Sequence, residues 1–206
     1  MRELHFLVMV VGTLLLPLPA GAVDSLKYEV LDKKPQERRN FVQGLEIVDG
    51  KLYVSSGNYG QSRLMRYNFE DMSLEVSKQL NRRLFAEGVT VLHERVYQLT
   101  WRERMMLVFD KRNLDYVEWF PIPGEGWGLT NDGEHLIYSD GSDRLHFLSP
   151  DDRKARRSIQ VSENGRPVRK LNELEWIEGR VWANIWHSNR IVIINPESGL
   201  VEASID

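Results

Sequence analysis

The sequence contains no cysteine among its 206 residues. This absence excludes disulfide-stapled scaffolds, thiol nucleophiles, CxxC redox pairs and cysteine-ligated zinc or iron-sulfur centres. An excess of positive charge is also missing, because 27 Lys and Arg face 30 Asp and Glu, for a formal net charge of -3. A chain with this balance has no broad electrostatic attraction to nucleic acid or anionic lipid, so we expect neither as a partner.

A long apolar run occurs only at the start of the chain. Arg2 precedes an apolar stretch from Phe6 to Leu18, and the small residues Ala20-Gly21-Ala22 follow it. The stretch is shorter than the roughly 20 apolar residues of a membrane-spanning helix. The pattern predicts a secretory signal peptide over residues 1–22, cleaved after Ala22, rather than a retained anchor. We therefore expect a periplasmic or secreted protein.

Long amphipathic helical patterns are absent from the rest of the chain. Short apolar runs such as Leu107-Val108-Phe109 and Ile191-Val192-Ile193-Ile194 are separated by Gly, Asn, Asp and Ser. This spacing is typical of an all-β chain. No Pro/Ser-rich linker or low-complexity segment marks a boundary, so we expect a single domain over residues 23–206.

The strand pattern repeats. Leu45, Val89, Leu129 and Leu174 occupy one equivalent position, with spacings of 44, 40 and 45 residues, and each follows a Gly or, in the last copy, a Glu. A repeat of this length is typical of a four-stranded propeller blade. Small antiparallel sheets bury both faces when they stack radially, so the repeats predict a β-propeller. The alternative is an ordinary β-sandwich with accidental spacing.

Two further positions of the repeat carry residue types that suit a pocket. The position before the repeated motif holds Gln43, Glu87, Trp127 and Asn172, and the position twelve residues after each reference holds Gly57, Trp101, Gly141 and Trp186. The strand nearest the axis begins each blade of a propeller, and the loops leading into it line one mouth of the channel. We therefore expect these side chains to converge on one rim as a pocket wall.

Glu87 is the only acid at the first of these positions. An aromatic pocket raises a carboxyl pKa from about 4.3 toward neutrality by desolvation, which suits a lone general acid/base. The alternative for Glu87 is a structural carboxylate that accepts hydrogen bonds from backbone amides. The histidines are not at equivalent repeat positions, so we expect neither a catalytic triad nor a metal site from them. Those beyond residue 22 are His93, His135, His146 and His187.

Seven short segments carry a family resemblance. They are Phe41-Val42-Gln43-Gly44-Leu45-Glu46, Tyr59-Gly60-Gln61-Ser62, Phe85-Ala86-Glu87-Gly88-Val89-Thr90, Tyr97-Gln98-Leu99-Thr100-Trp101, Pro123-Gly124-Glu125-Gly126-Trp127-Gly128-Leu129-Thr130, Ser139-Asp140-Gly141-Ser142 and Leu171-Asn172-Glu173-Leu174-Glu175-Trp176. In order and spacing, these segments resemble the plant-type glutaminyl-peptide cyclotransferase family. The resemblance runs from about Tyr28 to the last residue.

The resemblance implies a five-bladed β-propeller enzyme, unrelated to the zinc-dependent animal enzymes. Such an enzyme converts the N-terminal glutamine of peptides or proteins to pyroglutamate and releases ammonia. By resemblance, Glu87 shuttles the protons, and Gln43 and Asn172 donate hydrogen bonds to the substrate or the oxyanion. The enclosing aromatic wall consists of Phe41, Phe85, Trp101, Trp127 and Trp186. We expect a monomer without a metal or other cofactor.

Departures from the family pattern accompany the resemblance. Val42 replaces the usual Thr, and Pro35-Gln36-Glu37 replaces a Pro-His-Asp stretch. Family members continue beyond the point that matches Asp206, so we expect an incomplete last blade, with Tyr28 to Asp32 as a strand available for ring closure. A non-catalytic propeller that binds peptide termini or sugars stays open as an alternative. A propeller dehydrogenase is a third interpretation, for which the sequence shows no cofactor fingerprint.

Overall fold

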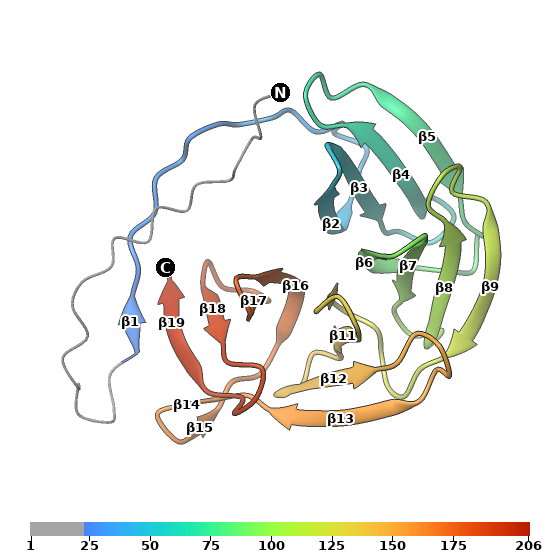
Figure 1. Ribbon diagram of the computed structural model, residues 1–206. Coiled ribbons are helices and arrows are strands. Elements are labelled where there is room, and N and C mark those ends of the chain that lie inside the picture. Colours follow the sequence, from blue (N-terminus) through green and yellow to red (C-terminus); the bar gives the residue numbers. More distant parts are fainter. Residues whose placement is uncertain (1–22) are drawn as a thin grey trace.

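A computed structural model describes residues 23–206, in which every regular element is a β-strand (Figure 1). The strands form four blades arranged around a common axis, which confirms the all-β class and the propeller-like arrangement. Among these residues there is no helix of the length and apolarity needed to cross a membrane. The predicted signal peptide, residues 1–22, lies outside the described residues.

Each blade is an antiparallel sheet whose strands follow one another from the axis outward. The first blade comprises β2 (Val42–Val48), β3 (Lys51–Ser56), β4 (Arg63–Asn68) and β5 (Leu74–Gln79). The second comprises β6 (Ala86–Leu92), β7 (Arg95–Thr100), β8 (Met105–Asp110) and β9 (Tyr116–Pro121). The third comprises β10 (Leu129–Asn131), β11 (Leu136–Ser139), β12 (Arg144–Leu148) and β13 (Ala155–Gln160). The fourth comprises β16 (Leu171–Ile177), β17 (Arg180–Ile185), β18 (Ile191–Ile194) and β19 (Val201–Ile205).

Three short strands complete the architecture. β1 (Asp24–Ser25) pairs in parallel with the outer edge of β19. β14 (Ser162–Glu163) and β15 (Arg166–Pro167) form a small hairpin that follows the third blade. β1 covers part of the edge that β19 would otherwise leave unpaired.

Two-residue turns fix the register of two inner strands. Asp49 and Gly50 have φ values of 51° and 70°, and Glu178 and Gly179 have values of 50° and 75°. Two successive positive φ angles define a type I′ turn, whose twist matches that of the paired strands. These turns join β2 to β3 and β16 to β17, so the side chains of the inner strands alternate in a defined way between the two faces of each blade.

Buried apolar side chains fill the spaces between successive blades. Tyr53 and Leu64 meet Val96 and Leu107 between the first and second blades, Leu99 and Met106 meet Leu129 and Leu136 between the second and third, and Ile137 and Phe147 meet Leu174 and Val181 between the third and fourth. Within residues 23–206, no such core cluster joins the fourth blade to the first. The remaining cluster, which includes Val54 and Met65, belongs to the first blade alone.

Glycine lets the inner strands approach one another closely at the axis. A Cβ atom on Gly44 would lie 2.7 Å from the amide nitrogen of Val89, and one on Gly88 would lie 2.5 Å from that of Leu129. A Cβ on Gly128 would lie 1.9 Å from the carbonyl oxygen of Asn172. These contacts explain the glycine of the repeated motif in the first three copies, because any side chain would separate adjacent blades.

At the fourth copy the equivalent residue is Glu173, and its side chain reaches the first blade. Glu173 Oε1 accepts a hydrogen bond of 3.2 Å from the amide of Leu45. The three other junctions between inner strands are contacts between backbones, whereas the junction between the fourth and first blades is bridged by this carboxyl group.

The prediction of five blades is not confirmed, because the described residues form four. The prediction of a strand over Tyr28 to Asp32 is wrong. These residues form no strand, and Tyr28 and Leu31 are 66% and 71% exposed. The N-terminal strand is instead Asp24–Ser25, since the free edge of β19 offers it backbone partners, and the chain then passes around the outside of the sector between the fourth and first blades (Figure 1).

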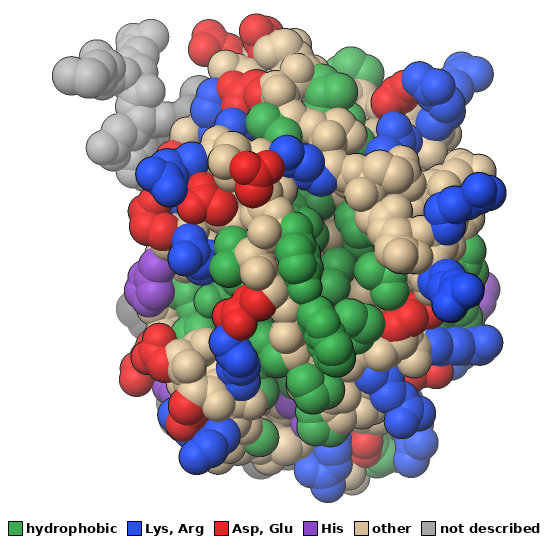
Figure 2. Space-filling view, turned by 90° about the vertical axis from the view of Figure 1, so that its right-hand side faces the viewer, with side chains coloured by type: hydrophobic (Ala, Val, Ile, Leu, Met, Phe, Trp, Pro, Cys, Tyr) green, Lys and Arg blue, Asp and Glu red, His purple; other side chains and the backbone are tan. Residues whose placement is uncertain are grey.

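An apolar strip lies on the outer side of the molecule where β5 and β9 run (Figure 2). Its large exposed side chains include Tyr116, Val117 and Trp119 of β9, each about half exposed. β9 is the outer strand of the second blade, so the strip lies far along the sheet from the inner strands at the axis.

Candidate active site

Two adjacent blades bring together a carboxamide and a carboxyl group at equivalent repeat positions. Gln43 lies on the inner strand β2, Glu87 lies on the inner strand β6, and Gln43 Nε2 donates a hydrogen bond of 3.2 Å to Glu87 Oε1. Both positions come at the start of a blade, which is why residues 44 apart in the sequence meet. This pair is the centre of the candidate site.

The environment of Glu87 favours its neutral form. The residue is only 7% exposed, and this burial is the main cause that raises its pKa to about 8. The hydrogen bond from Gln43 acts in the opposite direction, because it stabilises the carboxylate. The negative charges of Glu125 and Glu103 raise the pKa further. A carboxyl group of this kind exchanges protons near neutral pH, as a general acid/base requires.

Phe85 is the centre of one group of aromatic side chains beside Glu87. Its ring meets those of Tyr59, Trp101 and Phe41 edge-on, with centroid distances of 5.3, 5.5 and 6.3 Å. Gly57 makes room for it, since a Cβ there would lie 2.6 Å from the Phe85 ring. The structure therefore groups Phe41, Phe85 and Trp101, and it adds Tyr59, which the sequence analysis did not select.

Trp127 and Trp186 form a second aromatic group. Their rings meet edge-on with centroids 5.4 Å apart. A Cβ on Gly141 would lie 2.6 Å from the Trp127 indole, so the glycine is needed for the ring to occupy this place. This repeat position therefore holds residues of two kinds. Tryptophan adds an aromatic ring, as at Trp101 and Trp186, and glycine leaves room for one, as at Gly57 and Gly141.

Two acidic side chains join these aromatic groups. Glu125 Oε2 accepts hydrogen bonds from the indole nitrogens of Trp101 (2.8 Å) and Trp127 (3.1 Å). Glu103 accepts hydrogen bonds from the Tyr59 hydroxyl (2.9 Å) and the Phe85 amide (3.3 Å). The sequence analysis missed both acids as site residues. The signals were the place of Glu125 inside the segment Pro123–Thr130, which contains Trp127, and the place of Glu103 at the repeat position equivalent to Tyr59.

Asn172 is the second residue of the inner strand β16 of the fourth blade and is held there by its backbone. Its carbonyl oxygen accepts a hydrogen bond of 2.9 Å from Ser139 Oγ and lies against Gly128. Within the part of the chain that the structure describes, its side-chain amide makes no hydrogen bond, and none joins it to Glu87.

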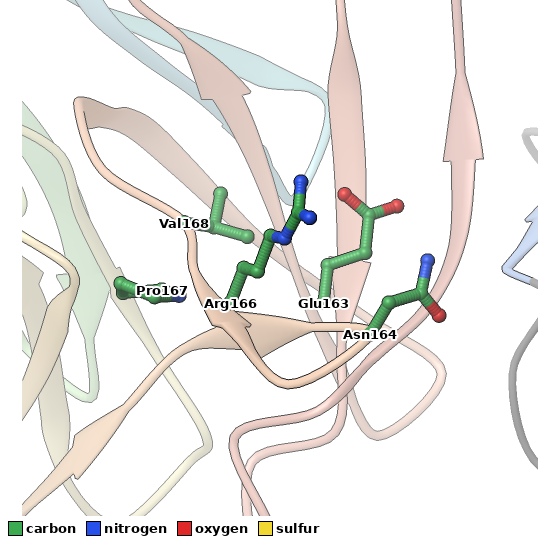
Figure 3. Close-up of a pocket in the computed structure, with 5 residues that line it drawn as sticks. All are labelled: Glu163, Asn164, Arg166, Pro167 and Val168. Carbon is green, nitrogen blue, oxygen red and sulfur yellow. The ribbon is translucent and has the colours of Figure 1, made fainter.

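A hollow in the surface of the described residues lies away from Glu87. It measures about 380 Å³ and is lined by Glu163, Asn164, Arg166, Pro167 and Val168 around the β14–β15 hairpin (Figure 3). Glu163 is already paired with Arg190 at 2.5 Å, and none of the residues near Glu87 contributes to this hollow.

Residues 23–206 also contain no group of three His, Asp or Glu side chains arranged to hold a metal ion.

The fold and the site together define a β-propeller protein with a buried carboxyl group of raised pKa and two groups of aromatic side chains that Glu125 links. A family model described as glutamine cyclotransferase matches residues 6–206. The chain belongs to this glutamine cyclotransferase family.

Individual relatives agree with this assignment. A curated glutaminyl-peptide cyclotransferase of Arabidopsis thaliana is 37% identical over 173 residues, which cover 83% of this chain and 54% of that protein. The crystal structure of Myxococcus xanthus glutaminyl cyclase matches with a TM-score of 0.80 and 33% identity, over 86% of this chain and 75% of that one. A Bacteroides caccae protein of unknown function matches with a TM-score of 0.61 and 13% identity, over 80% and 66% of the two chains, and shows the fold alone. The chain spans about half the length of the curated relative.

Proposed function

We propose that this protein is a glutaminyl-peptide cyclotransferase, which converts the N-terminal glutamine of peptides or proteins to pyroglutamate with release of ammonia. One observation carries the proposal: a buried carboxyl group, Glu87, with a pKa of about 8, accepts a hydrogen bond from a carboxamide and is close enough to Glu125, which binds Trp101 and Trp127, to be affected by its charge. The names of the Arabidopsis and Myxococcus relatives support the same reaction.

The reaction requires two proton transfers that one carboxyl group can perform. The α-amino nitrogen of the substrate attacks the Cδ atom of its own side chain, and the bond from Cδ to the side-chain nitrogen breaks. Glu87 as carboxylate accepts a proton from the attacking nitrogen, and as carboxylic acid it returns one to the leaving nitrogen, so ammonia departs. Its pKa of about 8 is close to that of a free α-amino group, about 7.7–8.0, so the transfer from the attacking nitrogen is not steeply uphill.

The other site residues bind and orient the substrate in this proposal. The Asn172 amide and the Gln43 carboxamide hydrogen-bond the substrate or the oxyanion that forms at Cδ, since amide groups supply donors of fixed direction. Phe41, Phe85, Trp101, Trp127 and Trp186 enclose the glutamine side chain. Because the reaction is intramolecular, folding this flexible side chain into its attack conformation is a large part of the catalysis.

The proposal extends to architecture and location. We place a fifth blade of the family's ring in the sector between the fourth and first blades. In support, Glu173 bridges this junction, whereas backbone contacts form the others.

We also propose a monomer whose signal peptide is cleaved after Ala22, active in the periplasm or outside the cell. The apolar run of residues 6–18 supports the export step.

The first test is ammonia release from a short peptide that begins with glutamine, by the purified protein with and without a chelator. Turnover that survives chelation supports metal-independent chemistry. Glu87→Gln should lower kcat by about 10²–10⁴-fold, the usual contribution of general acid/base catalysis. Glu134→Gln, an exposed acid at the β10–β11 turn, serves as the control and should retain full turnover.

The proposal is wrong if the folded wild-type protein releases no ammonia, or if Glu87→Gln is as active as the wild type. A protein that binds the peptide without turnover would instead support the alternative of a non-catalytic binding propeller.

A further inference from the structure

The loop between β9 and β10 places one carboxylate between two tryptophans from different parts of the chain. Trp101 follows β7 of the second blade, and Trp127 precedes β10 of the third blade. Both indole N–H groups donate to the same oxygen, Glu125 Oε2, at 2.8 and 3.1 Å. Hydrogen bonds to an ionised acceptor are about twice as strong as those between neutral groups. This carboxylate therefore joins the two aromatic groups of the site.

We infer that Glu125 is a positioning residue of the active site, which fixes the Trp101 and Trp127 indoles and thereby the aromatic wall beside Glu87. The inference rests on the proposed function. It concerns a residue that does not itself take part in the proton transfers.

Two further contacts restrain the Trp101 indole, whose N–H donates a hydrogen bond to Glu125. The guanidinium of Arg102 lies over the ring, 3.9 Å from its centroid, and Phe85 meets the ring edge-on at 5.5 Å. Arg102 also turns its Nε toward Glu125 Oε1, at 3.8 Å. The second oxygen of the carboxylate thus faces a cation that itself stacks on Trp101, so the three side chains support one another's positions.

The Trp127 indole is restrained in a similar way. Its ring meets Trp186 edge-on at 5.4 Å and lies directly against Gly141. Its backbone amide donates to the Ser139 carbonyl at 3.0 Å. The hydrogen bond from the indole N–H to Glu125 then fixes the rotation of the indole plane.

The backbone around Glu125 is fixed on both sides, so the carboxylate has a defined origin. Before it, the Tyr138 hydroxyl donates to the Pro123 carbonyl at 3.2 Å. After it, the Gly126 amide donates to the Trp101 carbonyl at 3.1 Å, and a Cβ on Gly126 would lie 2.6 Å from the Thr100 carbonyl oxygen. Glycine is therefore required beside Glu125 for the loop to pack against the second blade.

The charge of Glu125 has a second effect, which is separable from hydrogen bonding. The charged groups near Glu87 are Glu125 and Glu103 from the loops of the second blade and Glu173 from β16, with Arg102 beside Glu125. The negative charges favour the protonated form of Glu87. Glu125→Gln keeps an oxygen that accepts both indole bonds but removes the charge, and Glu125→Ala removes both.

The substrate-independent test is the proton–nitrogen correlation spectrum of the indole N–H groups, with Trp101 and Trp127 assigned by Phe substitutions. In Glu125→Ala both signals should move upfield and exchange faster with water, because they lose a charged acceptor. In Glu125→Gln both should stay hydrogen-bonded and slowly exchanging. Glu134→Ala is the control and should leave both signals unchanged. Signals that do not move in Glu125→Ala would overturn the inference.

The kinetic test uses the same variants. Glu125→Ala should lose about 10²-fold in kcat/KM, the order expected when groups that position a substrate shift by about 1 Å. Glu125→Gln should keep most of the wild-type kcat/KM. The acid limb of its pH profile of kcat/KM should move to lower pH, an effect that a merely structural role would not produce. Equal losses in the two variants would overturn the inference. If the wild type releases no ammonia, the proposed function fails, and the indole spectra still decide whether Glu125 fixes the wall.

Discussion

The protonation state of Glu87 depends on the balance between burial and one hydrogen bond. Burial, together with the charges of Glu125 and Glu103, raises its pKa to about 8, and the bond from Gln43 lowers it. Gln43→Leu removes a donor that stabilises only the ionised carboxylate. The pKa of Glu87 should therefore rise above its wild-type value.

This change is measured in the pH dependence of kcat/KM for the Gln-initiated peptide. The acid limb should move to higher pH in Gln43→Leu, whatever happens to the maximum rate. Gln160→Leu is a matched control, since Gln160 Nε2 donates to the Asp143 carboxylate at 2.7 Å on the outer strand β13. Its limb should coincide with that of the wild type. A limb that stays in place or moves to lower pH in Gln43→Leu contradicts the assignment of Glu87 as the base.

The sequence analysis selected some residues of the candidate site and missed others, and the repeat positions explain why. Glu87 and Gln43 were selected because they occupy equivalent repeat positions, and strand geometry then brings them within hydrogen-bond distance. Tyr59 and Glu103 also lie at equivalent positions, each 14 residues after its repeat reference, and they hydrogen-bond to each other, but that offset was not selected. Glu125 lies in the connection between the second and third blades, and its contacts depend on the path of that segment, which spacing along the sequence does not encode.

At the scale of the strands, the repeated glycine determines how closely the blades approach. Gly88 donates its amide to the Trp127 carbonyl at 2.7 Å, and its missing side chain leaves room for the backbone of Leu129. Gly88→Ala places a methyl group where no space exists, which forces β6 and β10 apart. We expect a loss in the free energy of unfolding of about 3 kcal/mol.

Denaturant unfolding of the purified variant measures this loss. Gly179→Ala is the control, since a Cβ there meets nothing within 4 Å and only its positive φ of 75° is unfavourable, at about 1 kcal/mol. If Gly88→Ala costs no more than Gly179→Ala, close packing of the inner strands does not limit stability.

The elements that the sequence predicted are those with a strong periodic pattern. The inner strands β2, β6, β10 and β16 contain the four reference residues of the repeat. The two-residue strands β1, β14 and β15 were not predicted, because so short a segment has no alternation to detect. The strand expected at Tyr28 to Asp32 does not form, because apolar character alone does not identify a pairing partner. The segment that pairs with β19 is Asp24–Ser25.

Across the whole molecule, buried carboxyl groups gather on the inner strands β2 and β16 of the first and fourth blades. Burial raises the pKa of Glu46 on β2 to about 7 and that of Glu175 on β16 to about 8, and it raises the pKa of Glu173 well above its usual range. The charge of Glu46 contributes at both acids of β16. One oxygen of Glu173 is buried without a hydrogen-bond partner in the described part of the chain. All three groups therefore favour the protonated state in the folded protein.

This gathering predicts how stability varies with pH. The folded state binds more protons than the unfolded chain between the unfolded pKa of about 4.5 and the folded values of about 7 to 8. Stability from these groups is therefore fully present below about 4.5 and is lost as pH rises through about 8. Glu175→Gln removes one titration, so at pH about 8 it should be more stable than the wild type by on the order of 4 kcal/mol, since the pKa rises from 4.5 to about 8 and each unit corresponds to about 1.4 kcal/mol.

Denaturant unfolding at several pH values between about 4.5 and 8 measures the effect. The curves of wild type and Glu175→Gln should meet near the acid end and separate toward the alkaline end, because only the wild type must ionise a buried carboxyl there. Glu118→Gln tests the effect of removing an exposed acid, one that pairs with Arg153 on the surface, and it should follow the wild type. Parallel curves for wild type and Glu175→Gln would mean that water reaches the Glu175 carboxyl group, so that it ionises as it does in the unfolded chain.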